Sequence, residues 1–199
     1  MFRVVAATSN KHKLEEFKKM LQDQKAEIVG LDSYPDMPPI EETGKTFREN
    51  SEIKALAANR YCDVPVFADD SGLEIEALNG APGVYSARYA ENPKACIERV
   101  LKEMKGQTNR KARFVCILSI AANGEIINSF EGEVRGRIID EPRGEGGFGY
   151  DPIFVPDGYE QTFAEMSEDQ KNQISHRARA CQAALEFIED EMSILDDDF

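Results

Sequence analysis

The stretch VPVFADDSG, residues 64–72, combines a run of apolar residues with two adjacent carboxylates. The apolar part is β-branched and aromatic, which predicts a short buried strand over residues 64–68, whereas the Ser-Gly that closes the stretch is typical of a turn. Ligands in open α/β sheets bind where strands end, so Asp69 and Asp70 are candidate metal ligands. An acidic turn solvated at the surface is an equal alternative for this pair taken alone.

The composition describes an acidic globular chain of 199 residues, with 41% hydrophobic residues, 31% charged residues and a formal net charge of −13. We expect one domain over residues 1–199, since no linker is evident, with a frayed acidic tail from about residue 194. The charge argues against general affinity for nucleic acid or anionic membranes, which need basic surface. Without a leader sequence or a long apolar stretch, a cytoplasmic location is expected.

The four cysteines are scattered along the chain and show neither a Cys-x-x-Cys pair nor the spacing of a zinc site. We therefore expect them to be small core residues. They are Cys62, Cys96, Cys116 and Cys181.

Strand-like and helix-like segments alternate in the first half of the chain, which is an α/β pattern. Extended residues 2–7 and 64–68 alternate with segments whose apolar residues recur at helical spacing, at 11–22, 46–60 and 93–105. An Asn-Pro pair precedes the last of these segments and provides a helix cap and a first-turn proline.

The second half begins with an antiparallel hairpin, predicted for residues 112–122 and 125–139 because Asn-Gly separates the two runs. A further extended segment at 153–155 precedes one long terminal helix. Two positions compete for the start of that helix. Ser167 has a capping pattern with the glutamine three residues later, and Ser175 can cap equally well.

Residues 8–13, TSNKHK, join the first predicted strand to the first predicted helix and place three potentially cationic side chains in its first turn. Cations at a helix N-terminus are unfavourable by roughly a few tenths of a kcal/mol each. A bound phosphate makes these cations favourable, because free backbone N–H groups, hydroxyls and lysines then become its ligands. We therefore favour a phosphate site over a tolerated surface cluster.

Residues 44–46, Gly-Lys-Thr, look like the end of a phosphate-binding P-loop, but the match fails. Pro39 stands where that loop needs glycine, and Glu41 and Glu42 would repel phosphates. These glutamates are a second source of carboxylates that could meet the aspartate pair around Mg²⁺. Acids ahead of a capped helix are an equal alternative.

Residues 144–149, GEGGFG, match the dinucleotide fingerprint by letter, but no strand precedes them and no helix follows. A glycine loop that carries Phe148 and Tyr150 could close over an aromatic base by stacking, although alone it is a plain loop. A second basic group lies near the C-terminus, and its structural alternative is the outer face of a helix. It consists of Lys171, His176, Arg177 and Arg179.

Six motifs occur in order over nearly the whole chain and closely resemble the inosine triphosphate pyrophosphatase family, whose members are also called Ham1-like or RdgB-like. The resemblance implies a two-lobed α/β fold of the Maf/Ham1 kind, with a long mixed β-sheet flanked by helices and a central substrate cleft. It also implies a homodimer. The motifs are residues 8–13, 41–44, 69–73, 80–88, 148–152 and 175–177.

The activity that the resemblance implies is an Mg²⁺-dependent hydrolysis of ITP, dITP and XTP to the nucleoside monophosphate and pyrophosphate. This reaction would keep deaminated purines out of DNA and RNA. The implied metal ligands are Glu41 and Asp70; Asp70 would also accept a proton from water, and Asp69 would orient or tune the site. The implied phosphate contacts are Thr8, Ser9, Asn10, Lys11, His12 and Lys13. The implied base and sugar contacts are Ser71, Phe148, Gly149, Tyr150, Asp151, Lys171, His176 and Arg177.

The residue chemistry fits this activity independently of the resemblance. Attack on the α-phosphorus needs a metal to neutralise charge, an activated water and positioned cations. Hypoxanthine and xanthine present O6 as an acceptor where adenine has an amino donor, so a donor from Lys171, His176 or Arg177 would reject adenine. Guanine also carries O6, and the sequence does not show how GTP is rejected.

Two other functions compete with this interpretation. The related Maf-like nucleotide pyrophosphatases share the architecture but prefer other bases, and the motifs on the base side weigh against them. A nucleotide-binding regulator without catalysis would need the phosphate and base sites, but it would not need two acids at a strand end.

Overall fold

The computed structural model describes residues 2–22 and 26–197. In these residues a six-stranded sheet has the order β2-β1-β3-β4-β5-β6. β1 pairs in parallel with β2 and β3, whereas all later pairs are antiparallel, so the predicted mixed sheet is confirmed. The strands are β1 (Phe2–Ala6), β2 (Ala26–Gly30), β3 (Val66–Ile75), β4 (Lys111–Ala122), β5 (Glu125–Ile138) and β6 (Phe154–Pro156).

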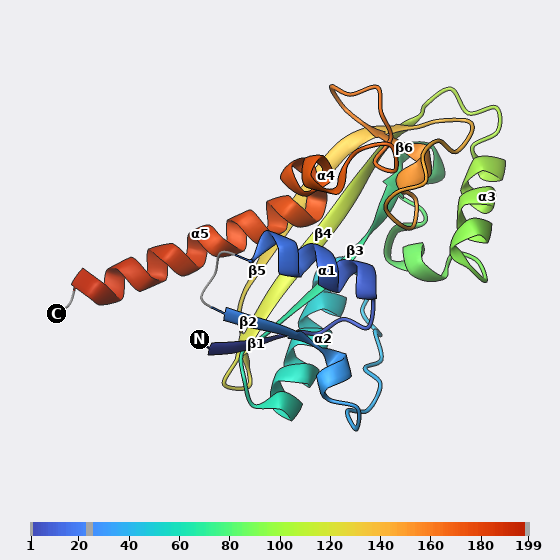
Figure 1. The fold of residues 1–199 in the computed structure, drawn as a ribbon. Coiled ribbons are helices and arrows are strands. Elements are labelled where there is room, and N and C mark those ends of the chain that lie inside the picture. Colours follow the sequence, from blue (N-terminus) through green and yellow to red (C-terminus); the bar gives the residue numbers. More distant parts are fainter. Residues whose placement is uncertain (1, 23–25, 198–199) are drawn as a thin grey trace.

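Helices cover the sheet, and the molecule has two lobes (Figure 1). One lobe holds β1, β2 and α2, the other holds β6 and α3, and the long β4–β5 hairpin runs through both. The α-helices are α1 (Lys11–Met20), α2 (Phe47–Cys62), α3 (Pro93–Glu103), α4 (Glu168–Ile174) and α5 (His176–Asp197). The 3-10 helices are η1 (Leu31–Ser33), η2 (Glu76–Leu78), η3 (Gly83–Arg88) and η4 (Asp151–Ile153).

The third strand is longer than the sequence predicts. We expected it to end at Ala68, but β3 continues to Ile75, and the aspartate pair lies inside it. Asp69 is opposite Leu118 and Asp70 is opposite Ile117 in β4. The polar residues stay extended because β4 supplies hydrogen-bonding partners along the whole length of β3.

Alternation along β3 directs its side chains to two faces of the sheet. Phe67 packs with residues of α1 and α5, whereas Val66 and Ala68 pack with residues of α2. Helices α1 and α5 therefore cover one face, and α2 covers the other. Because they are neighbours on a strand, Asp69 and Asp70 point to opposite faces.

The hairpin between β4 and β5 turns at Asn123 and Gly124, as predicted. Both residues have positive φ, 54° and 81°, which is the backbone that a tight two-residue hairpin requires. Asn59 of α2 accepts a hydrogen bond from the Gly124 N–H at 2.8 Å and fastens this turn to the helix.

The terminal helical region consists of two helices, so the prediction of one long helix is wrong. Both competing serines act as caps: Ser167 Oγ accepts from the Gln170 N–H at 3.2 Å, and Ser175 Oγ accepts from the Ala178 N–H at 3.1 Å. Helix α5 runs through Asp197, so residues 194–197 are helical where we expected fraying. Residues 198–199 lie outside the described residues.

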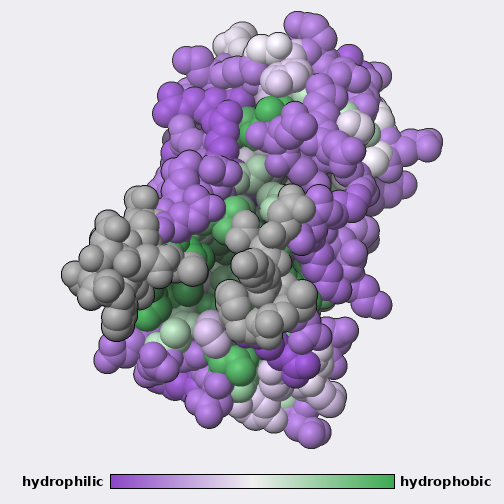
Figure 2. Space-filling view, turned by 60° about the vertical axis from the view of Figure 1, so that its left-hand side comes forward, coloured by the Kyte–Doolittle hydropathy of each residue, from purple (hydrophilic) through white to green (hydrophobic). Residues whose placement is uncertain are grey.

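The hydrophobic core is split between the lobes, and three cysteines contribute to it as expected. Cys96, Cys116 and Cys181 are buried, Cys62 is half-buried, and all four are free thiols. Hydrophilic residues dominate the face in Figure 2, and hydrophobic residues are visible near its middle. None of the helices described is long and apolar enough to cross a membrane.

Gly132 of β5 allows α5 to lie close against the sheet. A Cβ here would lie 2.5 Å from the Ala180 backbone nitrogen and would also overlap the His176 carbonyl oxygen. We expect Gly132→Ala to lower the free energy of unfolding by about 3 kcal/mol, because backbone atoms cannot move aside as a flexible side chain can. Urea unfolding followed by circular dichroism measures this. The exposed neighbour is the control: Glu131→Ala should change stability by less than about 0.5 kcal/mol. Equal losses in the two variants would contradict the close approach.

Candidate functional site

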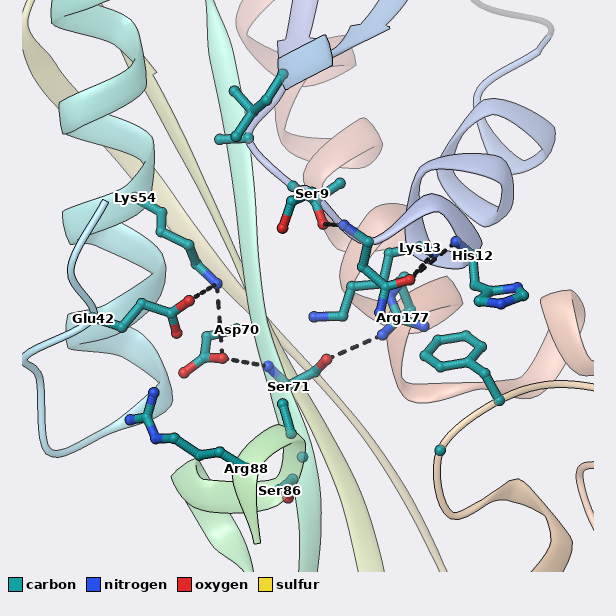
Figure 3. Close-up of a pocket in the computed structure, with 18 of the residues that line it drawn as sticks. Ser9, His12, Lys13, Glu42, Lys54, Asp70, Ser71, Ser86, Arg88 and Arg177 are labelled. Carbon is teal, nitrogen blue, oxygen red and sulfur yellow. Dashed lines mark hydrogen bonds and ion pairs between the residues drawn. The ribbon is translucent and has the colours of Figure 1, made fainter. Parts of the chain in front are cut away.

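A cleft of about 990 Å³ lies between the lobes, as the resemblance implies, and β3 crosses it (Figure 3). Three of the predicted site residues, Lys11, Glu41 and Asp69, do not line it. The predicted residues that do line it are Thr8, Ser9, Asn10, His12, Lys13, Asp70, Ser71, Phe148, Gly149, Tyr150, Asp151, Lys171, His176 and Arg177.

The segment from Thr8 to Lys13 forms one wall of the cleft at the start of α1. Asn10 caps this helix, because its Oδ1 accepts from the backbone N–H groups of His12 at 3.0 Å and Lys13 at 3.3 Å. Thr8 Oγ1 accepts from the Asn10 N–H at 3.1 Å. The turn is thus fixed by its own side chains, with Lys13 directed towards β3.

Asp69 is buried beneath the cleft and is held by two cations. Its Oδ2 accepts from Lys13 Nζ at 2.7 Å and from Ser71 Oγ at 3.0 Å, and Arg177 Nε lies 3.6 Å away. Burial raises the pKa of Asp69, but the charges of Lys13, Arg177 and Lys54 outweigh it, so the pKa lies below its ordinary value. Asp69 is therefore a fixed anion that orients these side chains.

Asp70 points to the other face and carries an oxygen with no partner. Lys54 Nζ lies 3.8 Å from Asp70 Oδ1 and 3.3 Å from Glu42 Oε1, whereas Asp70 Oδ2 is buried without a hydrogen bond. Burial raises the pKa of Asp70 above its ordinary value; Glu42 acts in the same direction and Lys54 against it. An unpaired carboxylate oxygen at a cleft can accept a proton or bind a cation.

Glu42, not Glu41, is the glutamate that faces Asp70. Glu41 is exposed and lies outside the cleft, whereas Glu42 lines it and lies beside Lys54. The loop that carries these residues is fixed to α2, because Asn50 Oδ1 accepts from the Gly44 N–H at 2.8 Å. A Cβ on Gly44 would lie 2.7 Å from that same oxygen, so only glycine fits here.

The carboxylates of Glu42 and Asp70 fit a hard divalent cation such as Mg²⁺. Mg²⁺ is typically held by one or two carboxylates together with waters and substrate phosphates. The described residues contain no group of three or more acids, histidines or cysteines placed to hold a metal. A site made of two carboxylates therefore depends on waters and on the substrate for its remaining ligands.

The opposite end of the cleft contains a buried network of two cations and two acids. Lys171 Nζ donates to Asp151 Oδ2 at 2.7 Å and to Glu16 Oε1 at 2.8 Å. Arg177 also donates to Glu16, and it donates to Ser71 Oγ at 3.0 Å. Glu16, on α1, thus joins the first helix to both terminal helices.

Aromatic rings line the same end of the cleft. His12 stacks on Phe148 with ring centroids 5.4 Å apart, so His12 lies beside the predicted base contact and not beside Asp70. His176 stacks on Phe114 at 4.8 Å. Burial and the charges of Arg177 and Lys171 hold the pKa of His176 well below its ordinary value, so its ring is neutral.

Tyr150 has a structural contact in addition to its place in the cleft. It is buried, and its hydroxyl donates to the Ser86 carbonyl oxygen at 2.8 Å. The ring is therefore anchored to η3. Phe148, which is half-buried, lies in the cleft with its ring stacked on His12 and the Lys171 ammonium 4.7 Å from its centroid.

Sequence reasoning missed residues that line the cleft or hold its side chains in place. Neither Lys54 nor Glu16 belongs to a motif, and their partners lie in other segments of the chain. The one available signal for Glu16 was its position between the core residues Leu14 and Phe17, which places an acid on the buried side of α1. The missed residues are Glu16, Lys54, Asn50 and Phe114.

The chain matches the Ham1 family model over residues 4–187. It is 46% identical over 194 residues to the dITP/XTP pyrophosphatase of Bacillus subtilis, which covers 95% of this chain and 98% of that protein. It is 47% identical over 186 residues to the dITP/XTP pyrophosphatase of Oceanobacillus iheyensis, covering 90% of this chain and 94% of the relative.

Two solved structures are similar along nearly the whole chain. The Ham1 protein of Staphylococcus aureus superposes with a TM-score of 0.85 at 42% identity, covering 95% of this chain and 99% of that one. A HAM1 protein from Coxiella burnetii gives a TM-score of 0.86 at 38% identity, covering 96% of this chain and 100% of the other.

The buried Glu16 network predicts a pH-dependent stability. Burial raises the pKa of Glu16, but Arg177 and Lys171 outweigh it, so the folded pKa lies below the ordinary 4.5. A carboxylate with a lowered folded pKa stabilises the protein above its unfolded pKa, and this stabilisation is lost as the pH falls through the folded pKa. At pH 7 we expect Glu16→Gln to cost about 3 kcal/mol, because two buried cations each lose one of their carboxylate partners, Lys171 keeping Asp151 and Arg177 keeping Asp69.

Urea unfolding at pH 7 and at about pH 3 measures this difference, which should shrink at the lower pH. The control is Glu15→Gln on the exposed side of the same helix, which should cost less than about 1 kcal/mol. A Glu16→Gln penalty that stays constant across this pH range would rule out the ion pairs as its source.

Proposed function

The chain belongs to the Ham1 family, and we propose that it is an Mg²⁺-dependent dITP/XTP pyrophosphatase. It hydrolyses deaminated purine nucleoside triphosphates, namely ITP, dITP and XTP, to the nucleoside monophosphate and pyrophosphate. The reaction removes these nucleotides from the pool and keeps them out of DNA and RNA. Relatives of that name match most of this chain and most of their own length, which supports the assignment.

The observation that carries the proposal is the unpaired Asp70 oxygen beside Glu42 and Lys54, at one end of a cleft whose other end is aromatic and cationic. The first end suits phosphates and a metal, and the second suits a purine. Mg²⁺ held by Glu42 and Asp70 would neutralise phosphate charge when bound. We propose Glu42 in place of Glu41 as the metal ligand, because Glu41 lies outside the cleft.

Asp70 is the proposed proton acceptor for the water that attacks the α-phosphorus. Its pKa is raised, so the carboxylate is a stronger base than an exposed aspartate. Lys13 reaches β3 from α1, and Lys54 reaches it from α2, so the two ammonium groups can orient the phosphates from both sides. Asp69 holds Lys13 in place and stays ionised throughout.

The base lies against Phe148 in this proposal, with Lys171 as the donor to O6. Lys171 uses two of its three N–H donors on Asp151 and Glu16, which leaves one for the base. An adenine amino group at this position would set donor against donor and leave both unpaired. The rejection of adenine thus depends on Lys171 being held by its two carboxylates.

The assembly and location of the protein complete the proposal. We propose that residues 1–199 form one catalytic domain, that the enzyme is a homodimer, and that it acts in the cytoplasm. A Maf-like pyrophosphatase is the alternative enzyme class, and the matched relatives favour the Ham1 assignment.

The first test is an assay of purified protein with Mg²⁺ over a panel of nucleotides. We expect pyrophosphate, not orthophosphate, to be released from ITP, dITP and XTP at least about 100-fold faster than from ATP, since a donor mismatch in a buried site discriminates strongly. Heat-treated protein and reactions with EDTA are the controls. Orthophosphate as the first product, or equal rates for all purines, would exclude this function.

A second test separates the two glutamates of the loop. Glu42→Gln removes a carboxylate beside Asp70, so we expect kcat to fall by about 100-fold and the Mg²⁺ concentration for half-maximal activity to rise. Glu41→Gln is the matched control on the preceding residue and should keep activity within about twofold, because its side chain is exposed outside the cleft. A large loss of activity in Glu41→Gln together with near-normal activity in Glu42→Gln would assign the metal to Glu41.

A further inference from the structure

We propose that Arg88 binds the β- and γ-phosphates of the substrate and holds pyrophosphate until it leaves. The proposal rests on the proposed function and adds a residue that the phosphate segment at the start of α1 does not include. Arg88 ends η3, in the motif of residues 80–88, to which neither the sequence nor the mechanism above gives a role.

The fold holds η3 firmly against β3 beside Asp70. Ser86 Oγ accepts from the Leu73 N–H at 2.9 Å and donates to the Gly83 carbonyl oxygen at 2.6 Å. A Cβ on Gly72 would lie 2.6 Å from that carbonyl oxygen, so glycine in β3 permits the close approach. The Tyr150 hydroxyl also fixes η3, because it donates to the Ser86 carbonyl oxygen. Arg88 therefore projects from a rigid support.

The Arg88 side chain lies on the carboxylate side of the cleft. Figure 3 shows its guanidinium group directed towards Asp70 and Glu42, on the opposite side of β3 from His12 and Arg177. Arg88 is exposed and lines the cleft. This position is at the phosphate end of the cleft and away from the aromatic and cationic end proposed for the base.

Arg88 has no carboxylate partner among the described residues, unlike the other cations near Asp70. Lys13 is paired with Asp69, and Lys54 is shared between Glu42 and Asp70. The Arg88 guanidinium lies over the Tyr85 ring, 5.5 Å from its centroid. Its N–H donors are thus free for a ligand.

A triphosphate brings several negative charges to a site that already contains two carboxylates. Lys13 and Lys54 are already paired with carboxylates, so the guanidinium of Arg88 adds positive charge for the terminal phosphates. The planar fork of an arginine binds phosphate oxygens in a bidentate way, which an ammonium group cannot do. The β- and γ-phosphates leave together as pyrophosphate, so the same contact holds the product.

The test measures pyrophosphate binding directly, by calorimetric titration of the protein in the presence of Mg²⁺. We expect Arg88→Met to bind pyrophosphate at least about tenfold more weakly than wild type, because the variant loses one charge-assisted pair with the phosphate oxygens. Arg88→Lys should be intermediate, because it keeps the charge without the fork. Binding of IMP should be unchanged in both variants. Arg60→Met, at the exposed end of α2 and outside the cleft, is the matched control.

Several outcomes would overturn the proposal. These are unchanged pyrophosphate affinity in Arg88→Met, an equal loss of IMP affinity, recovery of the loss at high Mg²⁺, or a wild-type protein without measurable pyrophosphate affinity. The proposed function is tested separately, because ITP hydrolysis by the wild type does not enter this measurement. If the wild type hydrolyses ITP but Arg88→Met binds pyrophosphate as well as the wild type does, the proposed function stands and the role of Arg88 is rejected.

Discussion

The ion pairs of the buried Asp69 are the interaction on which the rest of the site depends. This carboxylate sits in the central strand and contacts Lys13 from the first helix and Arg177 from the last. Breaking a buried pair by removing one partner is strongly destabilising, because an uncompensated charge remains. The start of α1 and the cationic end of the cleft are therefore positioned by the same anion.

Strand alternation explains how two adjacent aspartates acquire different chemistry. Asp69 faces two cations in the interior and has a lowered pKa, whereas Asp70 faces Glu42 and a single shared lysine and has a raised pKa. Nothing in the two side chains differs; only the faces of the sheet differ. One carboxylate thus serves as a permanent structural anion, and its neighbour remains able to take part in proton transfer.

Features specified by local chemistry could be predicted from the sequence, and features specified by distant partners could not. The Asn123-Gly124 turn and the helix caps depend on a few neighbouring residues, and the structure has them as expected. The end of the third strand was misplaced at Ala68 because pairing with β4, whose partner residues lie 37 to 49 positions further along the chain, extends it. The choice between Glu41 and Glu42 depends on how the loop is tied to α2, which spacing does not reveal. The resemblance supplied most site residues, and the tertiary contacts decide which of them meet.

The break at Ser175 changes the angular relation between two residues of the base end. In an uninterrupted α-helix, residues six positions apart differ in direction by about 120°, so Lys171 and Arg177 would project from different sides. The break resets the helical phase, and both side chains reach the carboxylate of Glu16. One serine outside both helices therefore sets the convergence of these cations. Inserting or deleting a single residue at this break would change the direction of α4 relative to α5 and separate the two cations, with every cleft side chain still present.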